Sequence, residues 1–282
     1  MSDTDLTLHE AAELLGVHYM TAYRYVRLGV LPAVKVGGSW HVTQADLQAF
    51  RDGASAAAST EQPKRRAPWA SRLESRLVAG DSAGAWGVVE AALAAGADLD
   101  EIYLDVITPA MRRIGERWAA GELDIAVEHR ATGIAQRLIG RLGPRFARRG
   151  RTRGHVLIGS PSGERHSLPT SMLADLLRGE GWEVSDLGAD MPTESFVSAA
   201  LLSPGLAAIG VSISSPEGAE AAPALCAALR EAVPGVSIVV GGNAVEGREH
   251  ALALGATHFA GSAREFAEQL ASGDSLTPRA GA

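Results

Sequence analysis

The 282-residue sequence has a single cysteine, Cys226, and aromatic residues make up only 5% of it. One cysteine excludes an internal disulfide framework and favours a reducing compartment, so we expect a cytoplasmic protein. The chain has no apolar run of the roughly 20 residues that a membrane span needs, and its polar start has no secretory signal pattern. We therefore expect no membrane partner. Hydrophobic residues still make up 46% of the chain, enough for two or three globular domains.

Positive charge is also scarce. The chain has 26 lysines and arginines against 33 acidic residues, a net charge of -7. Non-specific nucleic-acid binding depends on neutralising phosphates, so a general polyanion binder is excluded and any DNA contact must be local. The chain has no nucleophile elbow, phosphate-binding glycine loop or zinc cluster. We therefore expect no catalytic residues and no enzyme.

Residues 1–52 have the pattern of a winged helix-turn-helix DNA-binding domain. Thr7 and Glu10 form a capping-box pattern at the start of an apolar helix, which Gly16 ends. A β-hairpin is predicted around Gly37-Gly38-Ser39. The expected elements are helices over residues 7–15, 18–28 and 43–50 and strands over residues 34–36 and 40–42.

The second helix and the hairpin of this domain offer side chains that suit the major groove and the phosphates of operator DNA. These residues are His18, Thr21, Arg24, Arg27, Lys35, Ser39 and His41. Because residues 1–52 carry four cations against six anions, one copy should bind DNA weakly, whereas two or more copies, helped by Lys64-Arg65-Arg66 in the linker, would bind through avidity. The alternative is a three-helix module that binds another protein.

The next part of the chain is predicted to be a linker followed by a helical bundle. Residues 53–68 are small, polar and proline-containing, as in a flexible linker. Residues 69–150 show apolar positions at three- and four-residue intervals, with three breaks, which predicts a four-helix bundle. We expect Pro109 to interrupt one helix and Thr108 to cap its restart.

Residues 151–272 alternate between strands and helices and predict an α/β domain with a doubly wound, five-stranded parallel sheet. The expected strands are residues 155–160, 182–187, 206–212, 236–240 and 256–260, and the expected helices are residues 168–180, 193–202, 217–232 and 245–254. We expect residues 273–282 to be a disordered tail.

Ligands of such sheets bind beyond the carboxyl ends of the strands, so the loops there are the candidate site. The first loop places Glu164 two residues before His166, so the carboxylate can hydrogen-bond one ring nitrogen and leave the other for a metal. Small residues that allow close approach to the backbone follow two further strands. They are Ser212, Ser214, Gly241 and Gly242. Taken singly, each is also ordinary loop chemistry.

Together these loops resemble the flavodoxin-like cobalamin-binding domain in its base-off, histidine-on form, whose pattern is Asp-x-His-x-x-Gly, Ser-x-Leu and Gly-Gly. The resemblance implies that His166 is the lower axial cobalt ligand, that Glu164 is its hydrogen-bond partner, and that the displaced nucleotide tail lies in the slot beside the small residues. Two positions differ from the pattern. Glu164 stands for the usual aspartate, and Pro169 stands for the glycine and is expected to stiffen the loop.

The predicted bundle carries a second motif. Trp118 is followed, after nine residues, by Glu128-His129, which resembles the Trp-x9-Glu-His motif of CarH-type cobalamin photoreceptor repressors. The resemblance implies that these three residues contact the adenosyl group of adenosylcobalamin. It also implies a light-responsive repressor, with a MerR/excisionase-like DNA-binding domain and a cofactor-dependent dimer or tetramer. Ala119 departs from the motif, because a histidine follows the tryptophan in that family.

Two other functions remain open at this point. The same bundle and sheet occur in the corrinoid carrier subunits of cobalamin-dependent methyltransferase systems, which need a separate partner to supply the methyl group. Alternatively, the α/β domain has lost cobalamin and senses another ligand. If Trp118 is a core residue and Glu128 and His129 are ordinary surface residues, the second motif has no functional meaning.

Overall fold

The computed structural model describes residues 5–15, 17, 19–27, 31–36, 39–51, 67–148 and 150–272. These residues divide into two units, Met1–Ala67 and Pro68–Ala282. Five predicted features lie outside the described residues: the helix end at Gly16, the contact residue His18, the hairpin turn at Gly37-Gly38, the linker except for Ala67 and Pro68, and the tail over residues 273–282.

The N-terminal unit has the predicted winged helix-turn-helix order. Its elements are β1 (Asp5–Thr7), α1 (Leu8–Leu15), α2 (Tyr19–Arg27), β2 (Val34–Val36), β3 (Ser39–Thr43) and α3 (Gln44–Arg51). The predicted capping box is present, because the Thr7 backbone N–H donates to Glu10 and the Glu10 N–H donates to the Thr7 hydroxyl. Strand β1 was not predicted, and it pairs with β3 in a three-stranded sheet of order β1-β3-β2. Leu8, Leu31 and Val42 lie in its small core.

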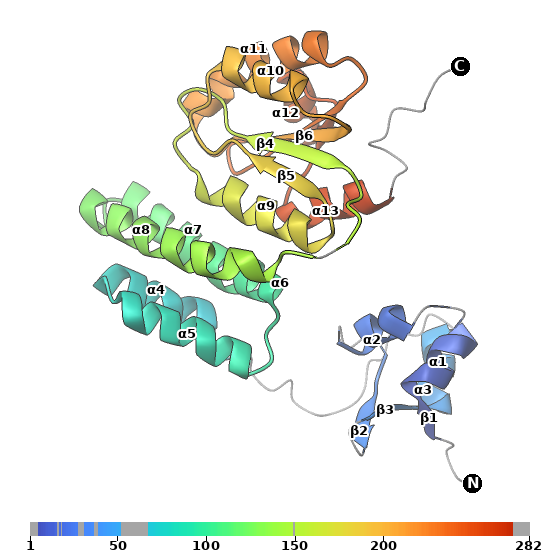
Figure 1. Cartoon of the computed structure of the whole chain (residues 1–282). Coiled ribbons are helices and arrows are strands. Elements are labelled where there is room, and N and C mark those ends of the chain that lie inside the picture. Colours follow the sequence, from blue (N-terminus) through green and yellow to red (C-terminus); the bar gives the residue numbers. More distant parts are fainter. Residues whose placement is uncertain are drawn as a thin grey trace, which may run out of the picture. The chain divides into compact units, whose positions relative to one another are not determined.

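The second unit begins with the predicted helical bundle. Its elements are α4 (Trp69–Ala79), α5 (Ser82–Ala94), α6 (Leu99–Glu101), the π-helix η1 (Ile102–Ile107), α7 (Thr108–Ala119) and α8 (Ile125–Leu142). The breaks are set by capping residues, because Asp81, Asp98 and Asp124 each accept a hydrogen bond from a backbone N–H in the first turn of the helix that follows. Since α6, η1 and α7 follow one another without a break, the bundle has four helical rods (Figure 1).

The prediction that Pro109 interrupts a helix is wrong. Thr108 keeps helical backbone angles, and its N–H bonds to the carbonyl of Tyr103, five residues back. Pro109, which has no backbone N–H, thus follows a π-turn inside a continuous helical segment and does not mark a helix end. The buried residues Ile102, Val106 and Ala110 are four apart, and at 3.6 residues per turn such a row drifts by about 40° at each step. The wider π-turn keeps this row facing the core.

The α/β domain has the predicted five-stranded parallel sheet in the order β5-β4-β6-β7-β8, the doubly wound order of flavodoxin-like folds. The strands are β4 (His155–Gly159), β5 (Glu183–Asp186), β6 (Leu206–Ser212), β7 (Ser237–Gly241) and β8 (His258–Phe259). The helices are α9 (Leu168–Gly179), α10 (Thr193–Leu201), α11 (Pro216–Ala232), α12 (Arg248–Ala253) and α13 (Ala263–Ser272), the last of which was not predicted.

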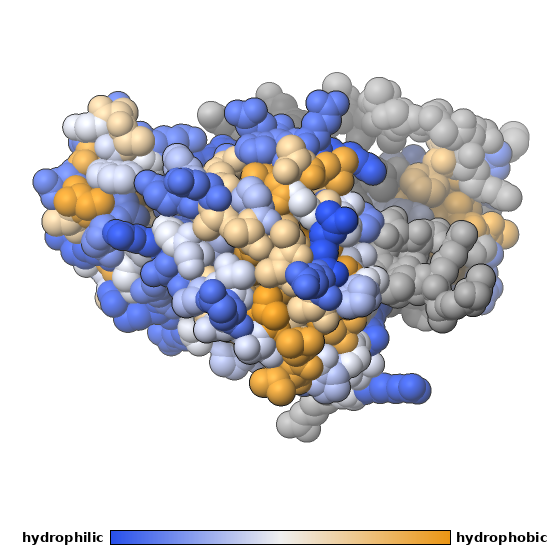
Figure 2. Space-filling model, turned by 90° about the horizontal axis from the view of Figure 1, so that it is seen from above, coloured by the Kyte–Doolittle hydropathy of each residue, from blue (hydrophilic) through white to orange (hydrophobic). Residues whose placement is uncertain are grey.

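Two helical layers cover this sheet. Helices α10, α11 and α12 pack on one face through residues such as Phe196 and Leu225, and α9 and α13 cover the other (Figure 1). Seen from above that view, hydrophilic residues surround a central apolar band (Figure 2). None of the described helices is long and apolar enough to cross a membrane.

The bundle packs against the α9 side of the α/β domain. Met172 and Leu176 of α9 belong to the core of the bundle. The buried phenol of Tyr103 donates a hydrogen bond to Asp175 on the same helix. This contact joins η1 to α9, and the Gln136 side chain of α8 donates a hydrogen bond to the Ser167 hydroxyl, so α8 lies close to the loop between β4 and α9.

Candidate functional site

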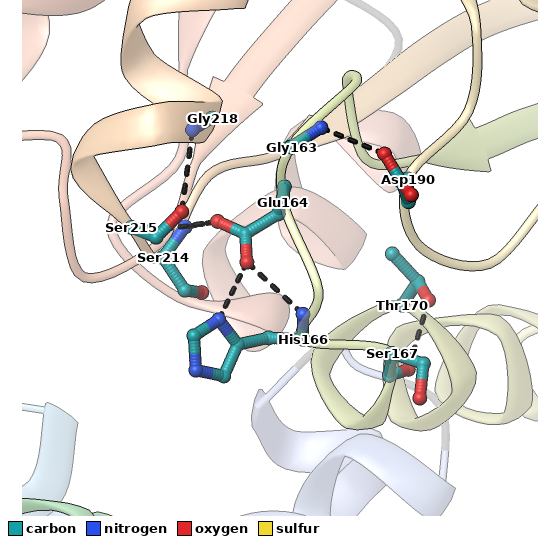
Figure 3. Close-up of polar contacts among 9 residues, drawn as sticks. All are labelled: Gly163, Glu164, His166, Ser167, Thr170, Asp190, Ser214, Ser215 and Gly218. Atoms are coloured by element: carbon teal, nitrogen blue, oxygen red, sulfur yellow. Dashed lines mark hydrogen bonds and ion pairs between the residues drawn. The ribbon is translucent and has the colours of Figure 1, made fainter.

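The candidate site is centred on the loop between β4 and α9, where the predicted contact between Glu164 and His166 is present. One carboxylate oxygen of Glu164 accepts hydrogen bonds from the backbone N–H and from the ring Nδ1 of His166 (Figure 3). The carboxyl of Glu164 is fully buried, whereas 56% of the His166 side chain is exposed. With Nδ1 held by an acceptor, Nε2 is the ring nitrogen that is free to bind a ligand.

The other oxygen of Glu164 reaches across the sheet. It accepts the backbone N–H groups of Ser214 and Ser215, in the loop after β6. Ser215 also caps the start of α11, where exposed N–H groups and the helix dipole favour a negative charge. Burial alone would raise the pKa of Glu164, but the hydrogen bonds from His166 and Ser214 lower it to about 2. Glu164 is therefore a fixed anion that ties the loops after two neighbouring strands together.

A third loop holds the opposite side of this segment. The Gly163 N–H donates to the carboxylate of Asp190, 2.7 Å away, and the Asp190 N–H donates to the carbonyl of Glu164 (Figure 3). Both residues have a positive φ angle, 85° for Gly163 and 52° for Asp190, a conformation that aspartate tolerates better than most side chains. The position of Glu164 is thus fixed from both neighbouring strands.

The two glycines after β7 are required by close backbone contacts. A Cβ on Gly241 would lie 2.3 Å from the carbonyl oxygen of Ala260, and one on Gly242 would lie 2.2 Å from that of Ile213. Ile213 lies between Ser212 and Ser214 and donates its N–H to the Gly241 carbonyl. The structure therefore brings together the six predicted residues of the α/β domain at the carboxyl ends of β4, β6 and β7.

The bundle faces this cluster through α8. The hydrogen bond that His166 donates to Glu164 raises the pKa of His166, burial opposes the rise, and the charges of Glu164, Glu128 and Glu217 add to it. Glu128 of α8 is therefore within electrostatic reach of His166. Glu128 also contacts the His129 ring and accepts a hydrogen bond from Thr132.

Two comparisons with family models bear on this arrangement. Residues 69–142 and residues 154–271 each match a model described as a B12 binding domain. The chain carries B12-binding domains. Residues 6–55 match a helix-turn-helix domain, so two B12-binding domains and a helix-turn-helix domain occur on one chain.

Curated relatives of this B12-binding chain include corrinoid proteins. It is 33% identical over 121 residues to trimethylamine corrinoid protein 1 of Methanosarcina acetivorans, covering 40% of this chain and 54% of the relative. It is also 33% identical over 113 residues to the trimethylamine corrinoid protein of Methanosarcina barkeri, covering 39% and 52% respectively. The chain therefore spans about half the length of the curated relatives it matches.

A solved structure shares the fold of the B12-binding domains. The monomethylamine corrinoid protein of Methanosarcina barkeri aligns with a TM-score of 0.61 and 23% identity, over 70% of this chain and 94% of that protein.

The site geometry fits a cobalamin. Because a corrin ring surrounds its own cobalt, the protein needs to supply one lower ligand rather than a ligand cluster. His166 offers Nε2 for this, and among the described residues no three His, Cys, Asp or Glu side chains are grouped to hold a bare metal ion. The buried hydroxyl of Ser160, at the end of β4, has no hydrogen-bond partner among the described residues. It remains available to a ligand beside the loop.

The remaining predicted bundle residue is only partly connected to this site. Trp118 lies near the end of α7 with 45% of its surface exposed, and in the described part of the chain no hydrogen bond or ring contact joins it to Glu128 or His129. Ala119 follows as the last residue of α7. Pro169 lies in the first turn of α9 rather than in the loop, a position where proline costs no hydrogen bond.

A cavity of about 500 Å³ lies between α8 and α9, next to Ser167. The residues that line it do not include the predicted cofactor residues. Polar groups on its wall include Gln136, Asp175, Arg178 and Asp186.

The predicted DNA-contact residues fall on the expected elements of the first unit. Thr21, Arg24 and Arg27 lie on α2, Lys35 lies on β2, and Ser39 and His41 lie on β3. Lys35 is exposed, whereas His41 is half-buried.

Several residues of the site were not predicted from the sequence. Asp190, Ser215 and Ser160 fix or line the loop after β4, and Gln136 of α8 contacts Ser167 through its side chain. Ser215 had a signal in the sequence, because serine before Pro216 and Glu217 is a typical helix start. The others depend on contacts between distant segments.

Proposed function

We propose that this chain is a cobalamin-binding transcriptional regulator, in which cofactor binding between the bundle and the α/β domain controls DNA binding by the first unit. The observation that carries the proposal is a helix-turn-helix domain on the same chain as two B12-binding domains. A protein that only carries methyl groups would have no use for a DNA-binding unit. We assign no catalytic residue to the chain.

In this proposal His166 would hold the cobalt of the cofactor through Nε2. The Glu164 carboxylate holds Nδ1–H, which fixes the tautomer and the direction of the ring. Gly241 and Gly242 keep the backbone beside β6 free of side chains, and the Ser160 hydroxyl and the loop serines Ser212 and Ser214 provide polar contacts for the nucleotide tail. When bound, the cofactor would supply a cobalt-ligand bond that light or ligand exchange can break.

We further propose adenosylcobalamin as the form that acts as the signal. Glu128 adds to the negative charge around His166, His129 follows it on α8, and Trp118 offers a large, partly exposed ring at the end of α7. An aromatic ring next to polar groups suits the adenosyl group, which needs both stacking and hydrogen bonds. Ala119 has no side-chain atom that could bind cobalt, so His129 is the bundle histidine that would be available to the cofactor.

The proposal is tested by loading the full chain with adenosylcobalamin in the dark and removing free cofactor. We expect retained pigment, and a dimer or tetramer that changes its gel-filtration volume and its affinity for duplex DNA after green light. The His166→Ala variant should lose lower-ligand coordination in its absorbance spectrum, and His250→Ala is the matched control. Equal spectra for His166→Ala and the unaltered protein contradict the site. Unchanged elution after illumination contradicts only the light response.

The second candidate is a corrinoid carrier of a methyltransferase system. It is favoured by the 33% identity to trimethylamine corrinoid proteins and uses the same His166 and Glu164. A carrier would accept and donate a methyl group with a partner methyltransferase. Methyl transfer to the loaded chain by such a partner, with no effect of cobalamin on DNA binding, would favour this function.

A further inference from the structure

One stretch of this acidic chain has the opposite charge. Between Glu128 and Glu164 the sequence contains eight arginines and no acidic residue, although the whole chain has a net charge of -7. Three of these arginines lie on α8, where Arg130 donates to the Val78 carbonyl and Arg141 stacks over Trp86. The others lie in the connection from α8 to β4. Arg149 is outside the described residues.

The described part of this connection presents four exposed guanidinium groups, on Arg145, Arg148, Arg151 and Arg153, which we call the arginine segment. Arg145 ends a short 3-10 helix, Gly143–Arg145, and Arg153 lies two residues before β4. None of the four forms an ion pair with a described residue. The segment is the yellow-green connection that rises to β4 in Figure 1.

The nearest carboxylates leave most of this charge uncompensated. Burial and the carboxylates of Asp98 and Glu180 raise the pKa of Asp100, and the charges of Arg264 and Arg148 oppose that rise. Asp100 therefore balances part of the charge of Arg148. Glu183 is exposed at the start of β5, opposite His155 in the sheet. Arg145, Arg151 and Arg153 remain available to an outside partner.

The arginine segment is also well separated from the cofactor site. The segment precedes β4, whereas His166 follows this strand, so the two lie at opposite ends of β4. Five residues of strand span roughly 16 Å. The segment therefore cannot serve the phosphate of a cobalamin at His166, and a partner bound there leaves the cofactor site open.

We propose that the arginine segment is a second DNA-binding surface, which contacts the phosphate backbone of the duplex bound by the helix-turn-helix unit. The planar guanidinium group pairs with phosphate through two parallel hydrogen bonds. A duplex is favoured over an acidic protein because residues 1–52 carry only four cations against six anions, and a cationic surface on the same chain adds positive charge at high effective concentration. The inference rests on the proposed DNA-binding function but not on cobalamin.

The test measures binding of a fluorescent 30-base-pair duplex of mixed sequence to the full chain without cofactor, at several salt concentrations. The triple variant Arg145→Gln, Arg151→Gln, Arg153→Gln should bind about tenfold or more weakly at low salt, with a salt slope shallower by about 2 to 3, since each phosphate contact contributes about 0.9 to the slope. The control replaces Arg112, Arg230 and Arg248 with Gln. It removes the same charge from exposed positions elsewhere and should change the slope much less.

Each outcome decides the inference. Equal slopes for the two triple variants overturn it. So does unchanged duplex binding combined with lost binding to poly-L-glutamate, which would indicate an acidic protein partner. A variant of the helix-turn-helix unit, Arg24→Gln with Lys35→Gln, separates this inference from the proposed DNA-binding function. If only this variant weakens duplex binding, the arginine segment does not contact DNA, whereas the helix-turn-helix unit does. If the full chain binds no duplex, the inference and the proposed DNA-binding function both fail. Matching circular dichroism spectra show that the variants are folded.

Discussion

Tyr103 donates a 2.8 Å hydrogen bond from its phenol to the carboxylate of Asp175, and both side chains are buried. The contact joins the π-helix of the bundle to α9 of the α/β domain. Asp175 also accepts a hydrogen bond from Arg178 at 3.0 Å, so its charge is balanced on the α/β side. Because α9 begins directly after the His166 loop, this buried polar contact fixes the bundle over the candidate cofactor site.

We expect the Tyr103→Phe variant to be less stable by about 1–3 kcal/mol, because it leaves a buried carboxylate without one of its donors. The measurement is the free energy of unfolding in urea at pH 7, compared with that of the unaltered chain. Tyr19→Phe, in the first unit, is the matched control. A loss as small as that of the control would show that the contact does not stabilise the interface.

The same pair predicts a loss of stability in alkali. Burial raises the pKa of Tyr103, and the hydrogen bond and the charge of Asp175 raise it further. A group whose pKa is raised on folding stabilises the protein fully below its unfolded value, about 10 for tyrosine, and this contribution is lost as pH rises above that value. The free energy of unfolding should therefore fall more steeply between about pH 9.5 and 11 in the unaltered chain than in Tyr103→Phe. Parallel curves would contradict this assignment.

The Glu164→Gln variant should retain cobalamin about 10- to 100-fold more weakly, the usual effect of removing the partner of a metal-binding histidine. A glutamine amide group turns its NH2 toward either His166 or the N–H groups of Ser214 and Ser215, so one of these contacts is lost. Affinity is measured by absorbance titration with the cofactor in the dark. Glu217→Gln, in the first turn of α11, removes a nearby exposed carboxylate and should bind normally. Equal affinities for the two variants would show that Glu164 does not position His166.

The Gly242→Ala variant should be much less stable than Gly247→Ala. Both glycines have positive φ angles, 117° and 139°, so both substitutions strain the backbone. A Cβ at Gly242 would also collide with the Ile213 carbonyl at 2.2 Å, whereas one at Gly247 would have no heavy atom within 4 Å. The difference in melting temperature between the variants measures the collision. Similar melting temperatures would mean that β6 and β7 move apart easily at this edge.

Local sequence signals predicted much of the fold and half of the site. The Thr7 and Glu10 pair marked the first helix, and the alternation of apolar strands with helices predicted the five-stranded parallel sheet. The two-residue spacing of Glu164 and His166 predicted their contact, because side chains two apart in an extended loop point the same way. These signals are reliable because the residues that determine each local structure lie within a few positions of one another in the sequence.

Contacts between distant segments could not be predicted in this way. The bond from Ser214 to Glu164 spans 50 residues, and that from Tyr103 to Asp175 spans 72. Each depends on how loops and helices pack after the strands have paired. Pro109 misled for a related reason, because its usual effect on a helix was overridden by the packing of Ile102, Val106 and Ala110 against the core.

The π-helix has a consequence for changes in chain length. Its hydrogen bond from Thr108 to Tyr103 spans one residue more than an α-helical bond does. Deleting one residue between Tyr103 and Thr108 would leave an ordinary α-turn, with the rods on both sides still in phase. This segment should therefore tolerate a one-residue deletion, whereas a deletion within α8 would rotate Glu128 by about 100° relative to the rest of that helix.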